Sequence, residues 1–265
     1  MPPEYLPYYV IAAGLFGLLL GSFLNVCIYR IPRDISVVTP RSFCPECGKP
    51  VAWHDNIPLA SYLLLRGRCR YCTERIGWRY PLVELTTALL FAIIAAGYGW
   101  HLAALKWMTF EALLIVLFWT DFEEQILPDE FTIGGTLIGA ILAIFVTVPS
   151  LFGQLFFPQW KPVARSLFNA ALGAVVLSLP LWLLGVLYAR IRKREGLGFG
   201  DVKLLMLFGV FLGLEKGLQA LMIGAVAGSV FGIIYLFVTR SKASETALPF
   251  GSFLCAGAAL VPLFR

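Results

Sequence analysis

Long apolar runs are the feature that most constrains what this chain can fold into. A helix that crosses the hydrocarbon core of a bilayer needs about 20 mostly apolar residues. The sequence offers about eight such runs, near residues 8–29, 81–99, 102–120, 131–149, 166–189, 202–214, 218–239 and 248–264. Because 59% of the residues are hydrophobic and only 14% are charged, the chain has too little polar surface to coat a water-soluble globule. We therefore expect an all-α polytopic membrane protein with about eight transmembrane helices in a lipid bilayer.

The basic residues are distributed unevenly between these runs. Segments 30–80, 190–203 and 240–247 hold 16 of the 21 Lys and Arg residues. Because Lys and Arg are enriched on the cytoplasmic side of membrane proteins, these segments are predicted to be cytoplasmic and both termini to face outward. The net charge of +5 is then a topology signal, and no nucleic-acid partner is expected. The first run lacks a preceding basic residue and a cleavage site, so a retained helix is predicted.

Four cysteines lie in the hydrophilic segment between the first two runs. Cys44 and Cys47 form one C-x-x-C pair, and Cys69 and Cys72 form a second pair 21 residues further on. A reducing compartment argues against disulfides, and the spacing is typical of a tetrahedral four-thiolate zinc site. We predict a structural zinc ion, since a catalytic zinc needs an open ligand position. Redox chemistry, and His54 as a substitute ligand, are the alternatives.

The sequence divides into a first transmembrane helix (1–30), a four-cysteine loop (31–80) and a larger membrane part (81–265). Two polar residues interrupt the apolar runs that flank the loop. Asn25 is interpreted as a helix-packing residue, with a polar site facing a substrate as the alternative. Glu84 either interacts with the helix dipole or belongs to such a polar site.

Two aspartates lie where apolar runs meet the cytoplasmic side. Asp121 ends one run, where the helix dipole opposes a negative charge, and Asp201 begins another. Ionisable groups at a membrane boundary are functional candidates. Two carboxylates in contact share one proton, so that one acts as a base and the other as an acid. Such a pair can activate water against a peptide carbonyl, and the sequence therefore predicts an aspartyl peptidase.

Glycines and further acids surround these two aspartates. Gly196, Gly198 and Gly200 precede Asp201, and their small size would let a substrate peptide approach it. Asp129, which follows Pro128, is interpreted as a helix cap. The segment Pro249–Gly251 is interpreted as a packing kink at the start of the last run.

Several of these motifs together resemble the type IV prepilin peptidase family. They are Gly198-Phe199-Gly200-Asp201 with Lys203, the turn from Asp121 to Pro128-Asp129, the two cysteine pairs with Asn56-Ile57-Pro58, and Arg79-Tyr80-Pro81-Leu82-Val83-Glu84. The resemblance covers nearly the whole chain. It implies an enzyme of the bacterial inner membrane that removes the basic leader of type IV prepilins or type II secretion pseudopilins after a glycine. It also implies that Asp121 and Asp201 are the catalytic pair.

The four-cysteine loop extends what the resemblance implies. Family members with this loop also methylate the new N-terminus with S-adenosyl-L-methionine, and the same cofactor is expected here. On this basis Glu123 and Glu124, in the only acidic cytoplasmic turn, are hypothesised to bind the basic leader. A proton-coupled transporter that uses the aspartate pair is the alternative from another functional class.

Overall fold

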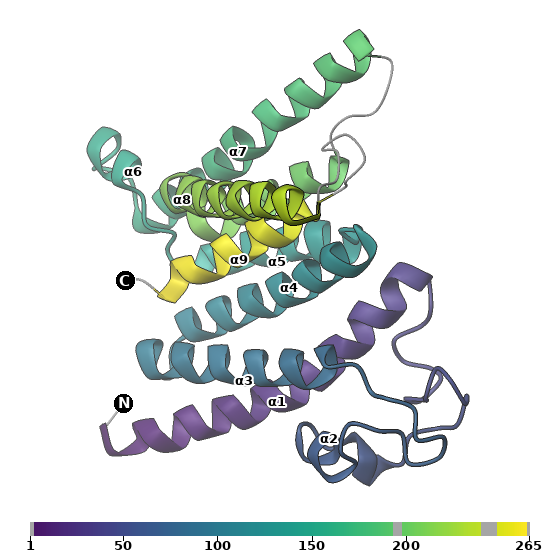
Figure 1. Ribbon diagram of the computed structural model, residues 1–265. Coiled ribbons are helices and arrows are strands. Elements are labelled where there is room, and N and C mark those ends of the chain that lie inside the picture. The colour runs from purple at the N-terminus through teal and green to yellow at the C-terminus, as the bar shows by residue number, and fades with distance from the viewer. Residues whose placement is uncertain (1–2, 193–197, 240–247, 264–265) are drawn as a thin grey trace. The chain divides into compact units, whose positions relative to one another are not determined.

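The computed structural model describes residues 3–192, 198–239 and 248–263 (Figure 1). Gly196 lies outside the described residues. Within them the regular structure is helical, with two isolated β-bridges in the cysteine loop. The expectation of an all-α protein is therefore confirmed for the part of the chain that the structure describes.

The longer helices correspond to the apolar runs. They are α1 (Leu6–Arg30), α3 (Arg79–Tyr98), α4 (Leu102–Glu124), α5 (Asp129–Phe145), α7 (Pro162–Arg192), α8 (Phe199–Thr239) and α9 (Phe250–Leu260). Two short helices are α2 (Ala60–Leu64) and α6 (Leu151–Phe156). Among the described residues, five helices are long and apolar enough to cross a membrane, namely α1, α3, α4, α7 and α8. Helices α5 and α9 are shorter, at 17 and 11 residues.

The predicted runs 202–214 and 218–239 both lie in α8, which is broken at Gly213. This residue has φ 76° and ψ −175°, a conformation that interrupts the helix and that L side chains avoid. The buried side chain of Asn169 stabilises the break, because its Oδ1 accepts a hydrogen bond from the Leu214 N–H while its Nδ2 donates to Pro149 O. The two parts of α8 thus match the two predicted runs in sequence.

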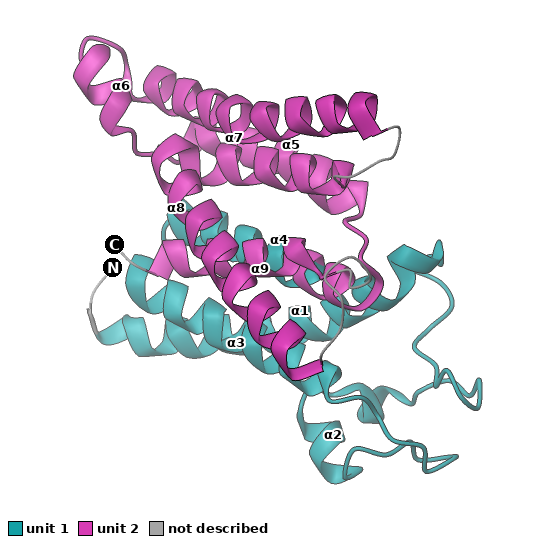
Figure 2. Ribbon diagram, turned by 45° about the horizontal axis from the view of Figure 1, so that its top comes forward, with its two compact units in different colours: residues 1–116 teal, residues 117–265 magenta. Residues whose placement is uncertain are grey.

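The chain divides into two compact units, residues 1–116 and 117–265, and the boundary lies within α4 (Figure 2). In the first unit α1 packs along α3. A Cβ atom on Gly21 would lie 2.7 Å from Glu84 Cα, so a glycine is needed for the two backbones to approach. In the second unit α7 packs along α8, α5 contacts both of these helices, and α9 packs against α8.

Large apolar side chains are exposed along the helices. Leu19 on α1 is 62% exposed and Phe237 on α8 is 81% exposed. Exposed apolar surface on this scale is unfavourable in water and favourable against lipid tails. These side chains are consistent with helices that face a bilayer.

Candidate functional site

The two aspartates singled out from the sequence lie in the second unit, at the ends of two helices. Asp121 is in the last turn of α4 and is only 6% exposed, and Asp201 is in the first turn of α8. The two carboxylates are close enough for the charge on Asp121 to act on Asp201 through space. The structure thus brings together two acidic groups that are 80 residues apart in the numbering, 121 and 201.

Ser252, a residue that the sequence analysis did not single out, contacts Asp121 directly. Its backbone N–H donates to Asp121 Oδ2 at 2.6 Å, and its hydroxyl lies 2.8 Å from the same oxygen. The hydroxyl is also 3.0 Å from Phe118 O, so its one proton is shared between two acceptors. Donors of this kind stabilise a carboxylate in its ionised form. One carboxylate oxygen of Asp121 therefore has two hydrogen-bond donors from Ser252, which partly offset its burial.

The start of α9 is shaped for this contact. Ser252 is in the first turn of α9, where backbone N–H groups lack partners within the helix. A Cβ atom on Gly251 would lie only 3.0 Å from Asp121 Cγ, so a larger residue here would push against the carboxylate. Pro249–Gly251, interpreted above as a packing kink, thus positions a donor for Asp121. In the sequence, the only sign of this contact was a serine directly after Pro249 and Gly251, at the start of the last apolar run.

The α4–α5 turn is held against the start of α8. Asp129 is the first residue of α5, and its carboxylate accepts a hydrogen bond from Lys203 Nζ at 2.5 Å. Pro128 occupies the N-cap position, and no side chain caps this helix, so the helix-cap interpretation of Asp129 is wrong. The local sequence pattern could not reveal the true partner of Asp129, because Lys203 is 74 residues away.

The described glycines before Asp201 differ in their surroundings. A Cβ atom on Gly200 would lie 3.1 Å from the Leu127 side chain, so Gly200 accommodates the α4–α5 turn. Among the described residues, only the Asp201 carboxylate lies near the Cβ position of Gly198, at 3.6 Å. Space beside the backbone is thus available at Gly198. Glu123 and Glu124 lie in the last turn of α4 and are exposed.

The four cysteines of the loop form one cluster in the first unit. Their sulfur atoms all lie within 4.8 Å of one another, and Cys44 Sγ is 3.8 Å from Cys72 Sγ. Four thiolates around a zinc ion, with Zn–S bonds of about 2.3 Å, place neighbouring sulfurs about 3.8 Å apart. The cluster therefore has the size and the donor set of a four-thiolate metal site, as the spacing predicted.

The two cysteine pairs lie in turns with the same backbone pattern. In the first turn, the Cys44 N–H donates to Lys49 O and the Gly48 N–H donates to Cys44 O. In the second, the Cys69 N–H donates to Glu74 O, and the Thr73 N–H donates to Cys69 O. In the second turn, hydrogen bonds from the backbone of Cys72 and Tyr71 lower the pKa of the Cys69 thiol to about 7, whereas burial and the neighbouring cysteines raise the pKa of the Cys72 thiol, so Cys69 is the member of this pair that loses its proton first. A thiol that loses its proton readily is suited to metal binding.

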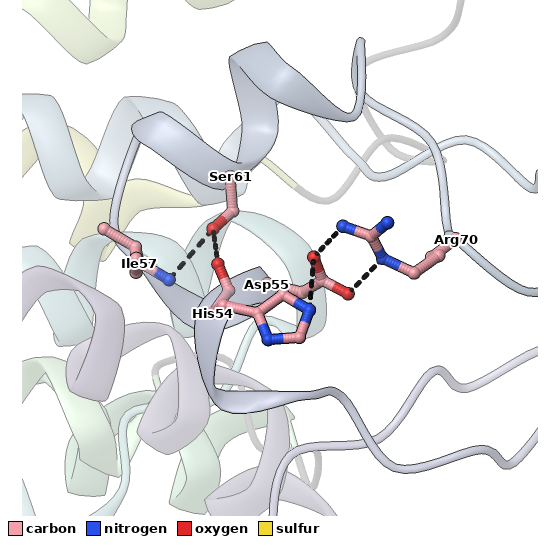
Figure 3. Close-up of polar contacts among 5 residues, drawn as sticks. All are labelled: His54, Asp55, Ile57, Ser61 and Arg70. Carbon is pink, nitrogen blue, oxygen red and sulfur yellow. Dashed lines mark hydrogen bonds and ion pairs between the residues drawn. The ribbon is translucent and has the colours of Figure 1, made fainter.

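The remainder of the loop is organised by polar contacts that Figure 3 shows. The Arg70 guanidinium donates to both carboxylate oxygens of Asp55, at 2.7 and 2.6 Å, and these hydrogen bonds lower the pKa of Asp55. The Ser61 hydroxyl donates to His54 O and accepts from the Ile57 N–H. The His54 side chain is 51% exposed and is not part of the cysteine cluster, so the alternative of His54 as a ligand has no support.

Fold and site together define a multi-pass membrane protein with an interacting pair of carboxylates and a four-cysteine cluster. Comparison with known families agrees. Residues 15–98 match the model of the bacterial peptidase A24 N-terminal domain, and residues 108–233 match the type IV leader peptidase family. The chain belongs to the type IV leader peptidase family.

Relatives from several bacteria carry the name prepilin leader peptidase/N-methyltransferase. A protein of Pseudomonas putida is 34% identical over 93% of this chain and 88% of its own length. Proteins of Myxococcus xanthus and Neisseria gonorrhoeae are 38% and 36% identical over 93% and 88% of this chain, and over 69% and 83% of their own lengths. No solved structure matches the chain. The transporter alternative finds no support, because both aspartates lie in terminal turns of their helices.

Proposed function

We propose that this protein is an aspartic endopeptidase of the bacterial inner membrane that removes the basic leader of type IV prepilins or pseudopilins after a glycine. The main support is the electrostatic interaction between Asp121 and Asp201, at the ends of two helices of one unit, in a chain whose relatives are named prepilin leader peptidase/N-methyltransferase. We further propose that it methylates the new N-terminus, with S-adenosyl-L-methionine as the methyl donor.

The surroundings of the two aspartates suggest a division of roles. Asp121, with donors from Ser252, is the ionised member and acts as the base. Asp201 holds the shared proton, because the nearby negative charge on Asp121 disfavours a second negative charge. Asp121 takes a proton from a water molecule as the water oxygen bonds to the scissile carbonyl carbon. Asp201 then gives its proton to the leaving amine nitrogen as the C–N bond breaks.

Replacement of Ser252 by Ala is expected to lower kcat about tenfold and to leave KM nearly unchanged, because it removes one hydrogen bond to a charged group that acts in the chemical step. Ser252→Thr keeps the hydroxyl and should restore most of the rate. Ser178→Ala is the matched control, since the Ser178 hydroxyl donates within α7 to Ala174 O. Equal kcat values for Ser252→Ala and Ser178→Ala, measured on a purified prepilin, would remove Ser252 from the site.

The exposed acids of α4 are proposed to receive the basic leader. The double variant Glu123→Lys/Glu124→Lys should raise KM about tenfold for a substrate with a basic leader at low salt, because it replaces attraction by repulsion. The effect should shrink as the salt concentration rises. A substrate with a neutral leader is the control and should show the same KM for both proteins. A KM that is unchanged with the basic leader at low salt contradicts this role.

The topology of the functional protein is also a proposal. We propose that α5 and α9 cross the membrane together with the five longer helices, and that the two parts of α8 each cross once. This gives about eight spans, with both termini in the periplasm and the four-cysteine loop and both aspartates at the cytoplasmic face. Residues 81–265 would then form the peptidase part. The Sγ atoms of Cys44, Cys47, Cys69 and Cys72 would hold a structural zinc ion that stabilises the loop.

The function is tested by incubating the full-length protein, in membranes or detergent, with a prepilin and S-adenosyl-L-methionine. Mass spectrometry of the product should show a pilin that lacks its leader and carries one methyl group on the new N-terminal residue. An intact prepilin after prolonged incubation would overturn the peptidase assignment. A cleaved but unmethylated product would overturn only the second activity.

A further inference from the structure

The first unit encloses a cavity that none of the roles proposed above uses. It has a volume of about 310 Å³ and is lined by residues of α1, of both cysteine turns and of the start of α3. Cavities of roughly 300–1,000 Å³ are typical of sites for small organic ligands. The cavity is therefore large enough for a small organic ligand, and its lining indicates which kind.

Glu84 contributes a buried carboxylate to the cavity wall. The residue is 8% exposed, and its Oε2 accepts a hydrogen bond from the Leu59 N–H at 2.8 Å. Leu59 adopts φ 57°, a left-handed value that is unfavourable for leucine, and in this conformation its N–H contacts Glu84. The Ser22 side chain also hydrogen-bonds to this carboxylate, but no cation pairs with it among the residues that the structure describes. A buried carboxylate without a cation is costly, and a positively charged ligand would supply the partner.

Asn25 contributes a buried acceptor to the same cavity. Its Nδ2 donates to Tyr80 O at 3.0 Å and to Gly21 O at 3.3 Å. Its Oδ1 has no hydrogen-bond partner in the structure, although the residue is only 2% exposed. Buried acceptors are rarely left unpaired. A ligand with N–H or O–H groups would satisfy this oxygen.

The other walls of the cavity are suited to a flat ring and to an anionic group. Tyr29 and Tyr80 line it together with Ile76, which gives aromatic and apolar surface of the kind that holds planar heterocycles. Lys49 and Arg75 also line the cavity and are exposed to solvent. The lining thus combines a buried carboxylate, apolar walls and cations, of which Arg30 is buried and donates to backbone carbonyls while Lys49 and Arg75 are exposed.

We infer that this cavity is the binding site for S-adenosyl-L-methionine, which joins a purine nucleoside to an amino acid with a positive sulfonium and a positive ammonium group. Glu84 and Asn25 bind the cationic, hydrogen-bond-donating part of the ligand, the tyrosines contact the purine, and Lys49 or Arg75 binds the carboxylate. This inference rests on the proposed methyltransferase function and assigns that activity to the first unit.

The test measures ligand binding by isothermal titration calorimetry on the full-length, zinc-loaded protein in detergent. Two probes are compared, S-adenosyl-L-methionine and the uncharged nucleoside 5′-methylthioadenosine. Glu84→Gln, which keeps the shape of the side chain, should weaken binding of S-adenosyl-L-methionine about tenfold or more, because a charged interaction is lost. Binding of 5′-methylthioadenosine should be unchanged. Equal S-adenosyl-L-methionine affinities for wild type and Glu84→Gln would overturn the site.

Two further variants test whether a change in binding is specific to the cavity. Glu111→Gln is the matched control, since Glu111 is a fully buried glutamate of the same unit that does not line the cavity. The affinity of this variant for both probes should equal that of the wild-type protein. Val26→Trp should fill the cavity and weaken both probes, whereas undiminished binding of both would overturn the site. Prepilin cleavage by each variant reports that the protein is folded.

The outcome also separates this inference from the proposed function. Suppose that the wild-type protein cleaves and methylates, and that the Glu84→Gln and Val26→Trp variants bind the methyl donor normally. This result would overturn only the proposed location of the binding site. A wild-type protein that binds S-adenosyl-L-methionine in a Glu84-dependent way and leaves prepilin intact supports the site and overturns the peptidase function.

Discussion

Asp121→Asn and Asp201→Asn are each expected to lower kcat for leader removal by about a thousandfold or more, because each variant removes one member of the proposed acid–base pair. An asparagine has nearly the same size and can still accept a hydrogen bond from Ser252, so loss of activity would report the loss of the ionisable group. The measurement is cleavage of a purified prepilin by membranes that contain equal amounts of each protein.

Asp129→Asn is the matched control for this prediction. It changes an aspartate of the same α4–α5 turn whose carboxylate pairs with Lys203. Because the Asp129 side chain is 57% exposed and asparagine can still accept a hydrogen bond from Lys203, this change should cost far less than the loss of a catalytic carboxylate, and cleavage should continue. Methylation of a pilin peptide that already lacks its leader should be normal in all three variants. Full cleavage by Asp201→Asn would end the peptidase hypothesis.

Cys72→Ser is expected to lower the bound zinc from about one ion per chain to almost none, because a four-thiolate site that loses one ligand binds the metal far more weakly. Methylation should be lost with the metal, because both cysteine turns line the cavity proposed for the methyl donor. Leader removal should continue, because Asp121 and Asp201 lie in the second unit.

Cys27→Ala provides the control for this prediction. Cys27 is a buried cysteine of α1 in the same unit, and its sulfur is outside the cluster. This variant should keep both the zinc and the methyltransferase activity, which are measured by elemental analysis and by transfer of a labelled methyl group. A zinc content in Cys72→Ser equal to that in Cys27→Ala would show that the cluster is not the metal site.

The helices and the cysteine cluster were predictable because their signals are local. Hydropathy predicts the ends of the apolar helices to within a few residues. Two C-x-x-C pairs are the sequence spacing that metal sites with four cysteine ligands commonly use. Helix α5 ends at Phe145, earlier than the predicted 149, because Val146 adopts an extended conformation. The break in α8 was anticipated only as a gap between two runs.

The contacts of the aspartates were less predictable, because they join distant segments. Ser252 and Asp121 are separated by 131 residues and Lys203 and Asp129 by 74, and no local pattern reports such pairs. A helix cap was the best local explanation for Asp129, and a kink was the best one for Pro249–Gly251. Topology alone predicted that Asp121 and Asp201 lie at the same face, but it did not identify the residue that stabilises the charge on Asp121.

The contact between Asp121 and the start of α9 has a consequence for biosynthesis. A nascent chain that has been synthesised only as far as Thr239 already contains both aspartates, and it lacks the N–H and the hydroxyl that Asp121 accepts. The proposed peptidase would then gain the donors for Asp121, and its full rate, only after the last helix has been synthesised and inserted.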